Sequence, residues 1–526
     1  MAVAKLSLPT LTTMVVGSMV GAGVFSLPSR FAAHTGVAGA LIAWAVAGTG
    51  MLMLAFVFQT LAVRRPDLDA GVYAYAKAGF GEYLGFFSAF GYWASACVGN
   101  VTYWVLIMST AGAVVPALGD GDTVLAVALS SVGLWLFFLL IRRGVKEAAA
   151  VNRIVTVAKV VPIIVFVLLA LFYLDPQVFA DNFAGADYAG SLFHQVKGTM
   201  LITVFVFLGV EGASVYSRHA RRREDVGRAT VLGFLSVFAI FASVTIVSYG
   251  LLPMGEIDRL RQPSMAGVLE YAVGTWGKVF VSVGLIVSVL GAYLAWTLMA
   301  AEVLFVAAKD DDMPRFLKSS TAADVPVPAL VMSTLLSQVF LIVTLFSDDA
   351  FDFALDLTSA LTLIPFLLAA AFAVQVALAG RRDRALAAAA SGPGARGGTG
   401  PPTGPGGRDG ERPGDGPGGP AGDAGRGPTD GTGAAAVVRG AGGRGHRDLF
   451  VALLATVYTA FLLYAAGPRF LLFSFIVYAP ATALFVMARR EQGRRLFSGR
   501  ELVVLAVSVV GAVVGIVALA LGWISL

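Results

Sequence analysis

The sequence predicts an all-α membrane protein with about thirteen transmembrane helices. Of the 526 residues, 57% are hydrophobic and only 13% are charged, whereas a soluble domain typically carries about twice that charged fraction. Apolar runs of about twenty residues recur along the chain, and at about 1.5 Å per residue each run can cross a hydrocarbon core of about 30 Å. We therefore expect the lipid bilayer to be the solvent of this protein.

The expected spans fall into two sets. The first ten lie near residues 10–28, 37–62, 83–114, 123–142, 152–174, 196–217, 228–252, 275–302, 329–347 and 353–379, and three more lie near 449–466, 469–488 and 502–525. All should be helical, because an unpaired backbone group is costly in lipid. The chain is thus expected to have a ten-helix core over 1–380 and three C-terminal helices over 448–526. The segment 381–447, rich in Gly, Pro and Arg, is expected to be a disordered loop.

Basic residues cluster in alternate loops. These are Arg64, Arg65 and Lys77; Arg142, Arg143 and Lys146; Arg218 with Arg221, Arg222 and Arg223; Lys309, Arg315 and Lys318; and Arg489, Arg490, Arg494 and Arg495. The positive-inside rule places these loops, and the N-terminus, on the cytoplasmic side. We therefore expect a multi-pass protein of the cytoplasmic membrane. The basic residues do not form one groove, so nucleic-acid binding is not expected.

Glycine clusters interrupt two of the expected helices. Span one reads TTMVVGSMVGAGVFSLPSR, with Gly17, Gly21 and Gly23 near its middle, and span six contains FVFLGVEGASVYS, in which two glycines flank Glu211. Gly17 and Gly21 alone would also fit close helix packing, but packing leaves the third glycine unexplained. Corresponding breaks in the first helices of two five-helix halves predict an inverted repeat with a central site, where free backbone amides face an anionic carboxylate.

Two ionisable residues fall inside expected spans. Glu211 needs a partner, a proton or a water-filled cavity at this depth, and we expect a role in transport. The alternative is a protonated carboxyl group bonded to a backbone carbonyl. Lys159 lies in VTVAKVVPIIVF, where its ammonium could bond open backbone near Pro162 in place of a sodium ion. Its alternative is extension of the side chain to the membrane interface.

Two aromatic residues are candidate walls of the central site. Trp296, in GAYLAWTLMAAE, falls near mid-span, where an interfacial anchor is not expected, and its ring could stack on a guanidinium or ammonium group. Phe205 directly precedes the span-six break, although ordinary packing would explain a single Phe equally well.

Other classes of function fit the sequence less well. The four histidines, His34, His194, His219 and His446, lie mainly in loops without ligand spacing, so neither a metal nor a cofactor is expected. Catalysis would need paired acid and base groups within the spans. No repeat resembles the filter of a channel.

Five stretches then occur in a fixed order along residues 8–380: GSMVGAGVFSLP, AGVYAYAKAGFGEYLGF, YWASACVGN, FVFLGVEGASV and AWTLMAAEVLFVAAKDDDMP. Together they resemble the basic amino acid/polyamine antiporter family of the amino acid-polyamine-organocation superfamily, and most closely its arginine/ornithine antiporters. The resemblance implies a LeuT-like 5+5 inverted repeat with discontinuous helices 1 and 6 that works by alternating access.

The resemblance also implies a binding role for ten residues. The amides around Gly21, Ala22 and Gly23 would hold the substrate carboxylate, and the carbonyls of Met19, Phe205 and Leu208 its α-amino group. Trp296 would cover the substrate side chain, with Ser95, Ala96 and Asn100 near its end. Glu211 would couple binding or pH to conformation, and Lys159 would take the place of sodium.

The function implied is exchange of cationic amino acids, arginine for ornithine and also lysine. A one-for-one swap of equal charges would move no net charge across the membrane. Two departures leave the substrate pose open: Phe205 and Ala22 stand where some arginine/agmatine exchangers have Trp and Ser. The alternative function is a proton-coupled symporter of neutral or broad-range amino acids. Whether two copies form a homodimer stays open.

Overall fold

The computed structural model describes residues 7–65, 67–68, 72–143, 148–185, 190–211, 223–321, 325–390 and 432–526. Every regular element in these ranges is helical, which confirms the predicted all-α class. The chain divides into two compact units, one formed by residues 1–374 with 451–526 and the other by residues 375–450. The candidate site lies wholly in the first unit.

The helices follow the predicted spans closely. Those up to residue 181 are α1 (Leu8–Met19), η1 (Gly23–Ser26), α2 (Leu27–Ala32), α3 (Val37–Arg64), α4 (Val72–Phe80), α5 (Glu82–Gly112), η2 (Pro116–Leu118), α6 (Val124–Arg142), α7 (Ala148–Phe172) and α8 (Pro176–Asp181). The later ones are α10 (Leu192–Gly198), α11 (Met200–Phe207), α13 (Arg223–Ser248), α14 (Met254–Asp258), α15 (Ser264–Val273), α16 (Thr275–Lys309), η4 (Arg315–Lys318), α17 (Val327–Val343), η5 (Thr344–Phe346), α18 (Ala350–Ala390), α19 (Thr432–Glu491) and α20 (Gly499–Ala520).

Nine described helices are long and apolar enough to cross a membrane, and the bent pair of α1 and α2 makes up to ten. The protein is therefore a multi-pass membrane protein, as predicted. The apolar helices over 158–172 and 192–207 are shorter, and α19 turns at Gly467, where φ is 71°. A count of thirteen spans further requires that α7 and the α10–α11 pair each cross the membrane and that α19 cross it twice. The count of thirteen therefore stays a prediction.

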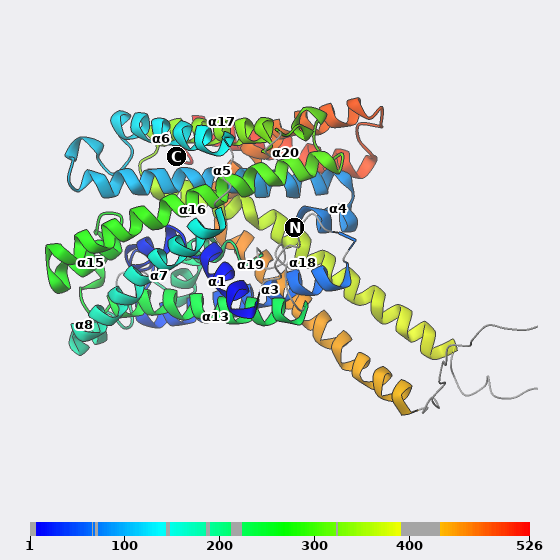
Figure 1. The fold of residues 1–526 in the computed structure, drawn as a ribbon, viewed down its shortest axis with the longest axis horizontal. Coiled ribbons are helices and arrows are strands. Elements are labelled where there is room, and N and C mark those ends of the chain that lie inside the picture. The colour runs from blue at the N-terminus through cyan, green and yellow to red at the C-terminus, as the bar shows by residue number, and fades with distance from the viewer. Residues whose placement is uncertain are drawn as a thin grey trace, which may run out of the picture. The chain divides into compact units, whose positions relative to one another are not determined.

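The helices of the first unit pack in two groups (Figure 1). In one group α5 lies against α16 and α17, and α6 lies against α17. In the other, α13 lies against α1 and α3, and α10 and α11 also contact α3. Helix α7 contacts α1, α13 and α16, so it joins the two groups. The interrupted helices α1 and α11 thus belong to one group, while α5 and α16 face them from the other.

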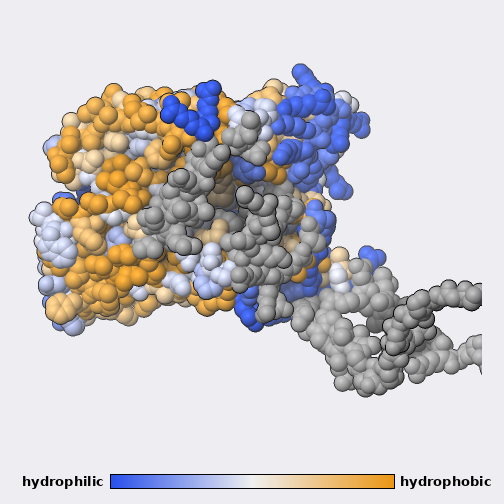
Figure 2. Space-filling view, viewed as in Figure 1, coloured by the Kyte–Doolittle hydropathy of each residue, from blue (hydrophilic) through white to orange (hydrophobic). Residues whose placement is uncertain are grey.

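The surface has the character expected of a membrane protein. Figure 2 shows hydrophobic residues over much of the side of the bundle and hydrophilic residues gathered at the end that carries α4. Large apolar side chains are exposed on several long helices, among them Leu136 on α6, Val283 on α16, Val339 on α17 and Val510 on α20. Exposed apolar side chains along whole helices are costly in water and favourable in lipid.

The predicted loop over 381–447 falls largely outside the described residues, which omit 391–431. On either side, α18 extends to Ala390 and α19 begins at Thr432. The predicted disorder of this segment therefore stays a prediction for residues 391–431.

One close contact allows the packing of the last helices on the core to be tested. A Cβ atom added at Gly50 on α3 would lie 2.2 Å from Cγ of Tyr458 on α19, and the Tyr458 ring is buried. We expect Gly50→Ala to destabilise the protein by about 1–3 kcal/mol, as overpacking does elsewhere. Thermal unfolding of the purified protein measures this change. Gly499→Ala is the control, because no atom lies within 4 Å of its added Cβ, and equal unfolding temperatures for the two variants would contradict the contact.

Candidate functional site

The first helix is interrupted where its glycines cluster. Helix α1 ends at Met19, Val20 is extended (φ −75°, ψ 101°), and the chain resumes in η1 at Gly23. The two helical pieces are bent by 51°. Among the hydrogen bonds of the described residues, none is donated by the amides of Gly21, Ala22 or Gly23. The break therefore leaves three backbone donors available at one place.

A second break follows α11. The helix ends at Phe207, Leu208 takes an extended ψ of 135°, and Gly209 has a φ of 102°, a conformation that favours glycine. Leu208 donates its amide to the Phe205 carbonyl at 3.2 Å. Residues 212–222, which include Gly212, lie outside the described residues, so the structure describes this break only up to Glu211.

The two breaks touch each other. The Ser18 hydroxyl donates to the Gly209 carbonyl at 3.1 Å, and a Cβ atom at Gly209 would lie 2.6 Å from the Ser18 carbonyl oxygen. A Cβ atom at Gly23 would lie 2.6 Å from Val206 Cγ1 and 2.8 Å from Phe205 Cδ1. Glycine at positions 23 and 209 is thus what permits this approach, as the sequence pattern indicated for a pair of facing breaks.

The Glu211 side chain accepts hydrogen bonds at the second break. One carboxylate oxygen accepts the Gly209 amide at 3.1 Å, and the other accepts the Tyr92 hydroxyl of α5 at 2.6 Å. The side chain is buried, with 4% of the residue exposed. The carboxylate therefore connects the interrupted helix of one group to α5 of the other.

Lys159 binds the first break in a similar way. Its Nζ donates to the Gly17 carbonyl at 3.2 Å, and only 2% of the residue is exposed. The ammonium is therefore buried against α1, one turn before the break, and does not extend to the membrane interface. It compensates a helix C-terminus, where carbonyl groups lack intrahelical partners.

A cavity of about 20 Å³ lies where the breaks meet α5 and α16. Its lining includes eight of the ten predicted binding residues: Met19, Gly21, Gly23, Ser95, Ala96, Phe205, Leu208 and Trp296. This volume suffices for about one water molecule, so the described conformation is closed around the site. The binding roles of these residues stay predictions, although the structure brings them together.

Two predicted residues lie outside this lining. Ala22 is fully buried at the first break, where only its backbone could serve a ligand. The Asn100 side chain donates from Nδ2 to Thr297 on α16 at 3.1 Å, and its Oδ1 is buried with no partner among the described residues. In this conformation Asn100 thus joins α5 to α16 beside the cavity.

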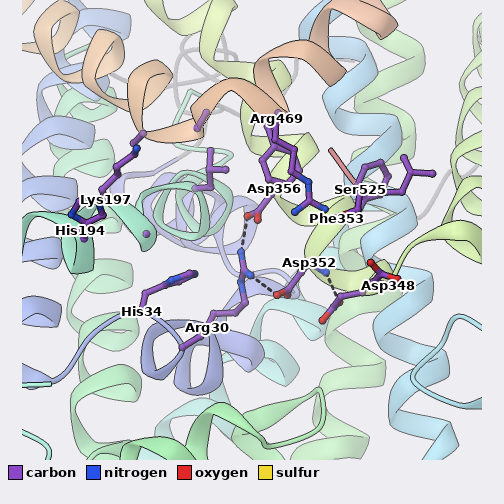
Figure 3. A pocket seen from close by; sticks show the side chains of 18 residues that line it. Arg30, His34, His194, Lys197, Asp348, Asp352, Phe353, Asp356, Arg469 and Ser525 are labelled. Atoms are coloured by element: carbon purple, nitrogen blue, oxygen red, sulfur yellow. Dashed lines mark hydrogen bonds and ion pairs between the residues drawn. The ribbon is translucent and has the colours of Figure 1, made fainter. Parts of the chain in front are cut away.

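A second, wider cavity of about 770 Å³ is here called the vestibule, and Figure 3 shows the side chains that line it. Leu201 lines the vestibule, and Phe205, one helical turn later on α11, lines the central cavity. The Arg30 side chain of α2 forms ion pairs with Asp352 and with Asp356 of α18, the latter at 2.6 Å. These ion pairs connect α2 to α18 in the lining of the vestibule.

The vestibule lining contains further charged groups besides Arg30, Asp352 and Asp356. Asp348 and Asp349 add two more carboxyl groups, while Lys197 and Arg469 add cations. Burial, and next the charge of Arg30, lowers the pKa of His34 to about 4, so its imidazole is neutral at neutral pH. Asp349 directly precedes α18, and burial raises the pKa of its carboxyl group above the usual value.

Sequence reasoning missed five residues of the central cavity and the vestibule ion pairs. The cavity residues are Ser18, Gly99, Tyr103, Val206 and Thr358. Ser18, Gly99 and Val206 lie inside the quoted motifs, whereas Tyr103 and Thr358 occur in apolar helical stretches without a distinctive pattern. Arg30 pairs with carboxylates more than 300 positions away. Arg30 lies just beyond the predicted end of span one at residue 28, so the sequence did not indicate that it needs a partner.

Comparison with known proteins identifies the family. The model of the family described as amino acid permease matches residues 6–384. The chain belongs to the amino acid permease family. It is 42% identical over 530 residues to an arginine/ornithine antiporter of Pseudomonas aeruginosa, covering 99% of this chain and 98% of that relative. This confirms the resemblance seen in the sequence motifs.

Two further relatives of this permease family member carry related names. An L-lysine transport protein of Corynebacterium glutamicum is 37% identical over 523 residues, with 99% of this chain and 96% of the relative covered. An arginine/agmatine antiporter of Chlamydia abortus is 36% identical over 372 residues, or 69% of this chain and 76% of the relative. Each of these relatives is named as a transport protein.

The contacts of Glu211 predict the effect of Glu211→Gln. A glutamine offers one acceptor oxygen in place of two, so either the Gly209 amide or the Tyr92 hydroxyl would face an N–H₂ group. Loss of a hydrogen bond to a charged group costs about 1.5–3 kcal/mol, which corresponds to a fall in amino acid transport of about tenfold or more. Initial rates in proteoliposomes across a pH series measure it.

Glu302→Gln is the matched control, because Glu302 lies on the exposed face of α16. We expect this control to transport at the wild-type rate. A Glu211→Gln protein with unchanged rates at every pH would remove Glu211 from the mechanism.

Proposed function

We propose that the chain is a secondary active transporter that exchanges cationic amino acids, arginine for ornithine and also lysine, by alternating access. One observation carries this proposal: two helix breaks meet at a cavity that is also lined by Trp296. The names of the three relatives support the substrate class. No catalytic chemistry is part of this proposal.

The ends of an amino acid match the two breaks in polarity. The three amides of Gly21, Ala22 and Gly23 lie at the N-terminal end of η1 and α2, where the helix dipole favours an anion. The last carbonyls of α1 and α11, at Met19 and Leu208 among others, lie at C-terminal ends, which favour a cation. A zwitterion therefore places its carboxylate on the first break and its α-amino group between the two helix ends.

The cationic side chain is recognised by an aromatic face. Trp296 is buried, with 8% of the residue exposed, and lines the central cavity. A guanidinium or ammonium group over an indole gains about 2 kcal/mol or more when desolvated. Asp348 and Asp349 at the vestibule rim raise the local concentration of cations before they reach Trp296.

Transport requires both ends of the site to open in turn. The central cavity is too small for an amino acid in the described conformation, while the vestibule is wide. Opening on this side separates α2 from α18, which requires Arg30 to release at least one of its carboxylates. We place this vestibule outside the cell and the basic loops and N-terminus in the cytoplasm, with the chain in the cytoplasmic membrane.

The architecture proposed is thirteen spans whose first ten form two inverted five-helix halves. The breaks in α1 and after α11 support it, since they fall at corresponding positions of the two halves. Lys159 supplies a fixed cation against the Gly17 carbonyl, so sodium is not required. Glu211 couples the second break to α5 through Tyr92.

Counterflow in proteoliposomes tests the proposed function. We expect labelled arginine to enter vesicles loaded with ornithine and not empty vesicles, at the same rate in sodium and in choline buffer. An imposed membrane potential should leave the rate unchanged, because the exchanged cations carry equal charge. Uptake into ornithine-free vesicles driven by a pH gradient would contradict exchange and would favour the proton-coupled symporter.

A further inference from the structure

One of the hydroxyl groups that line the central cavity has no hydrogen-bond partner among the described residues. Four hydroxyl side chains line it: Ser18, Ser95, Tyr103 and Thr358. Ser18 donates to the Val15 and Gly209 carbonyls, Ser95 to the Tyr92 carbonyl at 2.7 Å, and Thr358 to the Ala354 carbonyl at 2.7 Å. Within the described ranges, the Tyr103 hydroxyl makes no hydrogen bond.

Tyr103 is buried, with 6% of the residue exposed, and lies on α5 one turn after Asn100. A buried phenol without a partner loses the hydrogen bonds that it makes in water, at a cost of about 1–3 kcal/mol. Buried polar groups are nearly always satisfied in folded proteins. An unpaired hydroxyl at a binding cavity is therefore a position where a ligand completes the hydrogen bonding.

The hydroxyl points to the first break. A Cβ atom added at Gly21 would lie 3.1 Å from the Tyr103 hydroxyl oxygen, and 3.7 Å from its ring atom Cε1. The Tyr103 hydroxyl therefore packs directly against Gly21 of the first break. The free amides of Gly21, Ala22 and Gly23 belong to the same break, and among the described residues the lining of this cavity includes no carboxylate and no cationic side chain.

A group that can accept from the Tyr103 hydroxyl as well as from free amides of the first break is an anion with several acceptor lone pairs. A carboxylate has two oxygens and about four lone-pair sites, and hydrogen bonds to a charged acceptor are the stronger class. A decarboxylated amine such as agmatine would offer no acceptor here and would leave the Tyr103 hydroxyl unpaired.

We propose that the Tyr103 hydroxyl is a donor to the substrate carboxylate and makes the site selective for amino acids over their decarboxylated amines. This inference rests on the proposed function and adds a side-chain donor to the three backbone amides. Such selectivity is expected because a ligand that leaves a buried polar group of the site unpaired binds much more weakly than one that pairs it.

Inhibition constants for two ligands test the role of Tyr103. Uptake of labelled arginine by the reconstituted protein is inhibited with unlabelled L-arginine and with agmatine, which keeps the guanidinium group and an amino group and lacks the carboxylate. We expect Tyr103→Phe to raise the inhibition constant of arginine about tenfold or more, as loss of a hydrogen bond to a charged group requires. The constant for agmatine, which has no acceptor for the Tyr103 hydroxyl, should change less than twofold.

Tyr478→Phe is the matched control, because it removes a buried phenolic hydroxyl that donates to the Leu361 carbonyl, away from the cavity. Both inhibition constants should keep their wild-type values in this variant. Equal changes for arginine and agmatine in Tyr103→Phe would assign Tyr103 to packing, and an unchanged constant for arginine would also overturn the proposal. Wild-type protein that takes up no arginine would instead show that the proposed function is wrong.

Discussion

The structure depends on the contact between two interrupted helices inside a bilayer. Breaking a helix in lipid exposes backbone groups that have no water to bind, so each break must be compensated locally. Part of this compensation comes from the other break, because the Ser18 hydroxyl of the first break donates to the Gly209 carbonyl of the second. Gly23 and Gly209 make the approach possible, since a Cβ atom at either position would lie within 2.6 Å of the other segment. The groups that remain free at this contact are the ones that the proposed function assigns to the two ends of the substrate.

Buried charges stabilise the ends of these breaks. Lys159 meets the Gly17 carbonyl at the C-terminal end of α1, where a cation is favoured, and Glu211 accepts the Gly209 amide at the second break. Arg30 on α2 instead joins carboxylates of α18. Each charge connects an interrupted segment to a continuous helix, so movement of α1, α2 or α11 must change at least one of these interactions. A substrate that alters them can therefore change the conformation.

The sequence predicted the helices and both breaks because lipid imposes strong rules on it. Apolar runs must be helical, and clustered glycines such as Gly21 and Gly23 are unfavourable in a helix unless it is interrupted. Trp296 was also identified, since a mid-span indole does not fit an interfacial anchor. The pairing of Arg30 with Asp356 was not predictable in this way, because it depends on the packing of α2 against α18. Asn100 illustrates the same limit: its side chain binds Thr297 on α16, and that contact is set by helix rotation rather than by composition.

The central claim is that the free backbone groups of the two breaks bind the two ends of an amino acid. A high-resolution structure of the protein in nanodiscs with bound arginine tests it most directly. The account predicts the arginine carboxylate within hydrogen-bond distance of the Gly21 and Gly23 amides, and its α-amino group at the carbonyls of Met19 and Leu208. Arginine bound with its carboxylate in the vestibule, while Gly23 still packs on Phe205 and the central cavity stays closed, would contradict it.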